Sequence, residues 1–269
     1  NAGDFQRSVD QLAGFVDEHG VTEVFCNRDY PPNELNRDRA VADRLQARGV
    51  PVHGFDDQML APPRALNTGK GTPYTVFTAF KKRWDAWMDD ADPQPVPAPR
   101  KRPGAARFVG RGVVERALNE LSVDERLVAL WPAGEKDAAK QLQRFVEQDL
   151  ADYRRRRDFP DQPGTSGLSV ALSAGTLAPL DAYRAARLAM ADAGARDGAA
   201  CWIGELAWRD FYRQILHRFP RLATGAPFRP DTGLLRWSDN AQHLAAWCQG
   251  PTGHPLLGPP LPHRVQAGR

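Results

Sequence analysis

Two segments of the sequence combine charged, polar and aromatic side chains in patterns that can bind a ligand. The first places Tyr153 before four consecutive arginines, 154–157, and continues into a segment rich in hydroxyl side chains. A helix is expected to begin near Leu168, and nearby hydroxyls can cap it. These hydroxyls belong to Thr165, Ser166 and Ser169. Together with free N–H groups and the helix dipole they can bind phosphate, although a capped helix after a solvated basic loop is the plainer interpretation.

The second segment is an expected helix over residues 198–217. Helical spacing places four of its side chains on one side and Trp208 on the flank. These four are Trp202, Glu205, Arg209 and Tyr212. Glu205 and Arg209 either form a structural ion pair or address the polar edges of flat rings stacked among the aromatic side chains. Two tryptophans further along, Trp237 and Trp247, are by residue type core or rim aromatics. A lone histidine, such as His243 or His254, is more often structural than catalytic.

Composition narrows the class of protein. The 269 residues are 42% hydrophobic and 26% charged, which is typical of a globular chain. The net charge of +3 does not by itself predict nucleic-acid binding. Three scattered cysteines without metal-ligand spacing favour a reducing compartment and indicate no metal site. With no expected signal peptide or membrane span, the cytoplasm is the expected location.

The elements that must position these residues begin with an α/β region. Apolar spacing predicts helices over residues 5–16 and 40–45, a short buried strand at 21–25 and another strand at 50–55. A helix between two strands implies parallel pairing with a right-handed crossover. An open sheet of this class has more strands, which we expect before residue 1.

The rest of the chain is expected to be a connector followed by helices. Proline alternates along residues 92–103, which excludes a helix or central strand and favours an extended spacer. Further helices are expected from about residue 135 and over 179–192, 198–217 and 239–249. The first of them has one apolar face, made of Ala139, Leu142, Phe145, Val146 and Leu150. We therefore expect an α/β part at 1–58, a connector at 59–134, a helical part at 135–257 and an aberrant tail at 258–269.

Several motifs, in this order and spacing, resemble the photolyase/cryptochrome family, and specifically class I bacterial photolyases that repair cyclobutane pyrimidine dimers. They are Phe25–Asn27 with Asn33 and Glu34, Val50–Gln58, Thr68–Thr78 with Lys81 and Trp84, Arg157–Pro160, Thr165–Ser169 and Glu205–Arg209. The resemblance implies an antenna-binding α/β domain with a Rossmann-like open parallel sheet, then an all-α FAD-binding domain, both incomplete. The implied activity is light-dependent dimer repair by electron transfer from photoexcited reduced FAD.

The resemblance also implies individual roles. Glu205 would hydrogen-bond the dimer and stabilise it once reduced, Trp208 would stack on the flipped dimer, and Arg157 would contact the DNA backbone. Trp237 would be the outer member of the tryptophan chain that photoreduces the flavin. Asn33 and Glu34 would contact an antenna, expected to be methenyltetrahydrofolate. The residues implied to bind FAD are Tyr153, Thr165, Ser166, Leu168, Ser169, Trp202 and Arg209. Damaged DNA is the expected partner of a monomer.

The sequence departs from the family pattern at several positions. Gly167 stands where the family has arginine, Gly204 where it usually has asparagine, and Ala79 where it has proline. After Leu257 the sequence no longer follows the family. We therefore expect about half of a flavin site, weak or absent FAD binding, and no repair by this chain alone.

Other functions remain open at this stage. A cryptochrome-like blue-light photoreceptor would bind the same flavin, but Glu205 and Trp208 favour repair. A (6-4) photolyase is a weaker alternative, because residues 205–208 resemble the dimer-repairing photolyases more than the (6-4) kind. A non-enzymatic DNA-binding remnant would use the basic run and no cofactor, with binding that weakens in salt. An unfolded product that exposes its helical faces is a further alternative.

Overall fold

The structure, a computed structural model, describes residues 5–97, 116, 131, 133–249 and 252–253. The chain divides into two compact units. The first contains Asn1–Pro95 and Ala139–Gly233, and the second contains Val96–Ala138 and Leu234–Arg269. Every residue of the expected site lies in the first unit except Trp237, which lies in the second.

The first unit begins with the expected order of helices and strands. Helix α1 (Phe5–His19) precedes strand β1 (Val24–Asn27), and helix α2 (Pro32–Gln46) precedes strand β2 (Val52–Phe55). The strands pair in parallel, with β1 Val24 opposite β2 Val52. The α/β class and the parallel pairing are therefore confirmed, although β1 starts later than the predicted 21–25.

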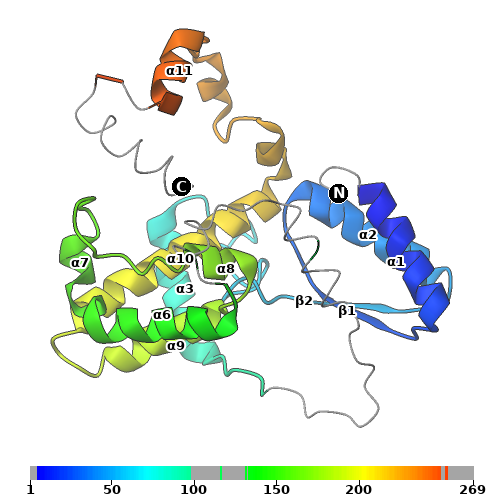
Figure 1. The fold of residues 1–269 in the computed structure, drawn as a ribbon, viewed down its shortest axis with the longest axis horizontal. Coiled ribbons are helices and arrows are strands. Elements are labelled where there is room, and N and C mark those ends of the chain that lie inside the picture. Colours follow the sequence, from blue (N-terminus) through cyan, green and yellow to red (C-terminus); the bar gives the residue numbers. More distant parts are fainter. Residues whose placement is uncertain (1–4, 98–115, 117–130, 132, 250–251, 254–269) are drawn as a thin grey trace. The chain divides into compact units, whose positions relative to one another are not determined.

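The prediction that the strand at 21–25 is buried is wrong, because no residue of β1 is buried and Phe25 and Cys26 are exposed. Helices α1 and α2 lie side by side over the strands (Figure 1), and they pack a small core that includes Val16 and Leu45. Alternate side chains of a strand point to opposite faces. Phe25 and Phe55 therefore lie on the face away from this core, where they are 62% and 54% exposed and stack at 6.4 Å between ring centroids.

Helix α3 (Phe77–Ala91) lies inside the expected connector and was not predicted from the sequence. It buries Phe80, Trp84 and Met88, which share one helical face. Residues 92–97, just after it, form neither helix nor strand, as predicted. The rest of the proline-rich run, like the expected tail at 258–269, lies outside the described residues.

The helical part that follows contains the expected helices and one that was not expected, in the arginine run that was interpreted as a solvated basic loop. They are α6 (Glu135–Gln148), α7 (Tyr153–Arg156), α8 (Ser169–Ala174), α9 (Pro179–Ala189), α10 (Arg196–Arg218) and α11 (Ala241–Gln249), with short 3-10 turns at Leu150–Asp152, Pro220–Thr224 and Pro230–Leu234. In α6 the buried alanine is Ala138 and not the predicted Ala139, which is exposed. One residue rotates a helical side chain by about 100°, which accounts for the difference.

Helix α10 is the centre of the first unit, and helices α3, α7 and α9 contact it (Figure 1). Its fully buried Asp210 accepts hydrogen bonds from the backbone N–H groups of Leu60 and Ala61 and, at 2.9 Å, from the indole N–H of Trp84. One turn later, buried Gln214 donates to the carbonyl oxygens of Pro63 and Leu66 at 3.1 and 2.9 Å. These bonds attach the segment between β2 and α3 to α10.

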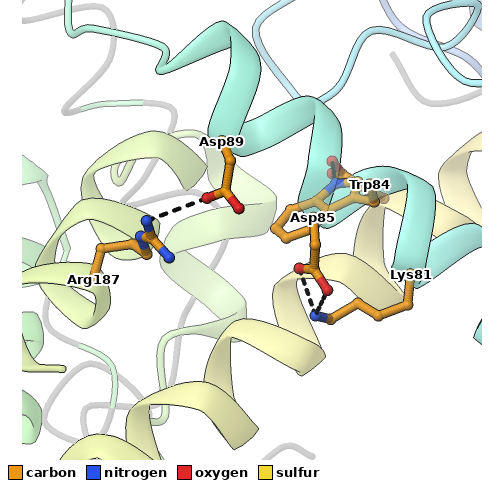
Figure 2. Close-up of polar contacts among 6 residues, drawn as sticks. Lys81, Trp84, Asp85, Asp89 and Arg187 are labelled. Carbon is orange, nitrogen blue, oxygen red and sulfur yellow. Dashed lines mark hydrogen bonds and ion pairs between the residues drawn. The ribbon is translucent and has the colours of Figure 1, made fainter.

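An ion pair at the surface joins α3 to α9. Figure 2 shows Asp89 of α3 facing Arg187 of α9, with 3.2 Å between Oδ1 and Nη2. Lys81 and Asp85 form a second ion pair, one turn apart within α3. Exposed pairs of this kind contribute about 0–1 kcal/mol, so the buried contacts of Trp84 fix α3 more than these pairs do. No helix in the described part of the chain is both long and apolar enough to cross a membrane.

We predict opposite effects for the same substitution at two glycines of α10. A Cβ on Gly198 would overlap the backbone carbonyl oxygen of Leu150. Gly198→Ala should therefore lower the free energy of unfolding by about 2 kcal/mol or more. A Cβ on Gly204 meets no atom within 4 Å, so Gly204→Ala should raise it by about 0.5–1 kcal/mol. Urea unfolding followed by circular dichroism measures both, and equal effects would contradict the packing described.

We also predict a pH dependence from Asp210. Burial raises the pKa of its carboxyl to about 6, against an ordinary value of 3.8, although three N–H donors oppose the shift. The folded state thus holds a proton that the unfolded chain has lost, so this contribution is present below about pH 4 and is lost as the pH rises through 6.

Asp210→Asn cannot titrate and serves as the reference. The unfolding free energy of the parent minus that of Asp210→Asn should fall between about pH 4 and 6 and then level off. Urea unfolding at steps of half a pH unit measures this difference. A difference that stays constant over the range would mean that the buried carboxyl does not change its protonation.

Candidate functional site

One face of α10 remains accessible while the opposite face is buried. The accessible side chains follow helical spacing and include Glu205 and Trp208, one turn apart. With Cys201 and Tyr212 they make a single stripe, and Gly204 interrupts it with open space where a side chain would stand. The buried face, which contains Asp210, holds the helix in place. The packing of α10 therefore determines which side chains a ligand can reach.

Glu205 pairs with Arg157 and not with Arg209. The guanidinium Nη1 of Arg157 donates to Oε1 of Glu205 and, at 3.6 Å, to Sγ of Cys201. Its carbon Cζ lies 5.6 Å from the ring centroid of Tyr153. The hydrogen bond to Glu205 raises the pKa of Arg157. The interpretation of Glu205 and Arg209 as a structural ion pair is wrong, because Arg157 from another segment occupies the carboxylate.

Arg209 is a half-buried cation. It donates to the backbone carbonyl oxygens of Gln58 and, at 3.2 Å, of Leu172 in α8. In the part of the chain that the structure describes it has no carboxylate within ion-pair distance. Burial, followed by the nearby charge of Arg213, lowers the pKa of Arg209 to about 10. The neighbouring charge of Asp210 opposes this lowering in part, and a bound anion would stabilise the guanidinium further.

Trp208 lies against other aromatic rings on the accessible face of α10. Its ring is parallel to that of Phe77, with 3.4 Å between centroids and 8° between planes. The ring of Tyr212, one turn further along α10, also stacks on Trp208, with 5.4 Å between ring centroids and 20° between ring planes. These contacts hold the indole in one orientation. Trp202 is buried more deeply than expected. It is only 4% exposed, and its ring centroid lies 4.9 Å from that of Phe145 in α6, so Trp202 is not part of the accessible face that carries Tyr212.

The hydroxyl segment before α8 forms a tight loop. Ser166 Oγ accepts a weak hydrogen bond from the N–H of Leu168 at 3.4 Å, and Gln141 of α6 donates to the Ser166 carbonyl oxygen at 2.9 Å. Gly167 has a left-handed φ of +63°, which favours glycine. The N-cap of α8 is Leu168, without a side-chain cap. The prediction that Thr165 or Ser169 caps the helix is therefore wrong, and both residues are exposed.

The interior side of this region is apolar. Leu168 is fully buried and Tyr153 is 7% exposed. The ring of Tyr153 packs perpendicular to that of Phe145, with 5.7 Å between the ring centroids. Burial raises the pKa of the Tyr153 phenol to about 12, so it is neutral at physiological pH. The structure thus brings Tyr153, Trp202 and Phe145 together beneath Arg157 and Glu205.

The arginine run is less basic than its sequence indicates. Asp152 accepts ion pairs from Arg155 and, at 3.3 Å, from Arg156. These arginines lower the pKa of the Asp152 carboxyl, chiefly through the hydrogen bond from Arg155. With Arg157 bound to Glu205, the predicted dense positive patch is partly neutralised by the chain's own carboxylates.

Three expected site residues lie apart from this group. Asn33 and Glu34 lie in the first turn of α2. They follow Pro31, which borders an open groove of about 420 Å³ that Tyr212 and Arg213 also line. Trp237 is 83% exposed and belongs to the second unit.

Sequence reasoning missed Cys201 beside Arg157 and Phe77 beside Trp208. Neither has a local signal, because both contacts join segments far apart in the chain. It also missed Asp210 as a buried anchor. A carboxylate among Leu206, Ala207, Phe211 and Ile215 was the available clue.

Family sequence models match both parts of the chain. The one described as DNA photolyase matches residues 3–100, and the one described as the FAD binding domain of DNA photolyase matches residues 202–258. The deoxyribodipyrimidine photo-lyase of Escherichia coli is 36% identical over 256 residues, which are 94% of this chain and 52% of that protein. That of Synechococcus is 33% identical and covers 99% of this chain and 55% of its own length. The chain therefore spans about half the length of these curated relatives.

Solved structures show the same relationship. A class III photolyase from Agrobacterium tumefaciens has a TM-score of 0.75 and 26% identity, and the match covers 95% of this chain and 52% of that one. A cryptochrome from Synechocystis also has a TM-score of 0.75 at 20% identity, over 97% and 55% of the two chains, and shows the shared fold alone. By its sequence and its fold, the chain belongs to the photolyase/cryptochrome family.

Proposed function

We propose that the protein takes part in light-dependent repair of cyclobutane pyrimidine dimers in DNA, as a deoxyribodipyrimidine photolyase of the class I kind. The observation that carries the proposal is the accessible stripe of α10. There Glu205 and Trp208 lie one turn apart, and Arg157 contacts Glu205. The curated relatives that are named deoxyribodipyrimidine photo-lyase support the same activity.

The chain's own residues would bind the damaged bases as follows. A dimer inside a duplex must be flipped out before an enzyme can reach it, at a cost of a few kcal/mol. Stacking on Trp208 returns about 1–3 kcal/mol per base, and Phe77 already holds the indole in place. Glu205 would accept hydrogen bonds from the N–H groups at the base edge and so stabilise the dimer once it is reduced. Arg157 would contact a DNA phosphate.

FAD is the cofactor that the family match implies, and the residues present fit its polar half. Arg209 offers a cation without a carboxylate partner in the described chain. The Thr165 and Ser169 hydroxyls are exposed at the start of α8, with Ser166 in the same loop. Buried Tyr153, Leu168 and Trp202 supply an apolar wall. When bound, reduced FAD supplies the electron that light drives to the dimer.

Two further roles belong to this proposal. Trp237 would be the outer tryptophan of the chain that photoreduces the flavin, and its exposed indole is in contact with solvent as such a residue must be. Asn33 and Glu34 would contact a folate antenna beside the groove that Pro31 borders. A monomer in the cytoplasm is part of the same proposal.

We predict that Trp208→Ala reduces the preference for damaged DNA by about tenfold, since the stacking of one base is lost. Fluorescence anisotropy compares a duplex that contains one thymine dimer with the same duplex undamaged. Phe15→Ala, which removes another exposed aromatic ring, on α1, is the control and should change nothing. An unchanged preference in Trp208→Ala would exclude this stacking role. Salt-dependent DNA binding by the parent without flavin binding and without preference for damage would favour a DNA-binding remnant. Flavin binding without preference for damage would favour a photoreceptor.

We predict that Arg209→Gln weakens FAD binding by about tenfold, because a charge-assisted contact with the cofactor diphosphate is lost. Quenching of flavin fluorescence measures the affinity. Riboflavin, which lacks the diphosphate, should bind equally to both proteins. Arg184→Gln on α9 is the charge-matched control. Equal weakening for FAD and riboflavin would mean that Arg209 acts only by holding Gln58 and Leu172.

A further inference from the structure

The contact between Arg157 and Glu205 joins the two groups that the proposed function assigns to different parts of the DNA. Arg157 follows α7, and Glu205 lies on α10. In the free chain, Nη1 of Arg157 donates to both Glu205 and Cys201, and Nε lies 3.4 Å from Asp158. The guanidinium is therefore already surrounded by acceptors of the chain itself.

Both partners can be reached from solution. The Arg157 side chain is 29% exposed and the Glu205 side chain is 36% exposed. Partly exposed pairs are weak because solvent screens them, so an incoming phosphate can compete for the guanidinium. Because a phosphate and a carboxylate repel each other across one cation, a phosphate on Arg157 weakens the hold on Glu205.

We propose that Arg157 restrains Glu205 in the free protein, and that it releases Glu205 only when a phosphate and a flipped base arrive together. This inference rests on the proposed function. A Glu205 carboxylate that loses Arg157 needs another donor, because a half-buried charge without a partner is unfavourable. A flipped base presents the N–H groups of its Watson–Crick edge, whereas in an undamaged duplex these groups are paired with the opposite strand.

The pair between Arg157 and Glu205 therefore lowers the affinity of the protein for undamaged DNA. An undamaged duplex can offer a phosphate to Arg157 but no flipped base to Glu205, so the cost of separating Arg157 from Glu205 is not offset. A duplex with a dimer replaces both contacts. Arg157 is therefore a positioning residue for Glu205 as well as a phosphate contact, and it helps the protein to discriminate dimer-containing DNA from undamaged DNA.

A double-mutant cycle on an undamaged duplex tests the inference. Glu205→Gln is made in the parent chain and in Arg157→Gln, and affinities are measured by fluorescence anisotropy over a range of salt concentrations. We expect Glu205→Gln to tighten binding of undamaged duplex about threefold in the parent, since Arg157 is then free. The slope of log affinity against log salt should steepen by about 0.9, the value for one additional phosphate contact.

The same substitution in Arg157→Gln should leave the slope unchanged and should tighten binding by less than in the parent. This background removes the general effect of deleting a negative charge, which would act with or without Arg157. Arg157→Lys keeps the charge and should restore part of the response to Glu205→Gln. Circular dichroism confirms that each variant is folded.

The outcomes separate this inference from the proposed function. Tightening that is equal in both backgrounds, or a constant salt slope, would overturn the inference while a preference of the parent for dimer-containing duplex still supports repair. Failure of every variant to bind either duplex would overturn both.

Discussion

The arrangement depends on a carboxylate buried in the middle of a helix. Asp210 is fully buried, and its three N–H donors come from the segment after β2 and from Trp84 of α3. A buried charge is tolerated only where donors surround it, so the chain cannot rotate α10 without breaking these bonds. Because about 100° separates successive helical side chains, this fixed rotation is what leaves Glu205 and Trp208 accessible. The anchor and the proposed chemistry thus occupy opposite faces of one helix.

Local patterns predicted the elements well, because periodic burial is written directly into the sequence. The two parallel strands and the helices at 179–192 and 198–217 followed from spacing alone. Helix α3 was missed because its apolar face, Phe80, Trp84 and Met88, lies next to a proline-rich run that drew the whole region into a connector. Burial of Phe25 was predicted wrongly, since a hydrophobic strand does not reveal whether one or both of its faces are covered.

The partners of charged side chains were the least predictable feature. Helical spacing offered Arg209 as the partner of Glu205, yet Arg157 takes that place from a segment that spacing cannot relate to it. Likewise, four adjacent arginines indicated a basic patch, while Asp152 neutralises part of it. The residue types of the site were visible in the sequence, but which charge remains available to a ligand is decided by tertiary contacts.

The loop at Gly167 shows how one departure from the family pattern bears on the proposed cofactor site. Its backbone is left-handed, and a Cβ there would lie 2.6 Å from Nε2 of Gln141. The loop is instead shaped by the hydrogen bond from Gln141 to the Ser166 carbonyl oxygen. An arginine at this position would have to displace the Gln141 amide and adopt a left-handed backbone. Under the proposed function, Arg209 would supply the cation for the FAD phosphates instead, since it reaches α8 at Leu172 and has no carboxylate of the described chain within ion-pair distance.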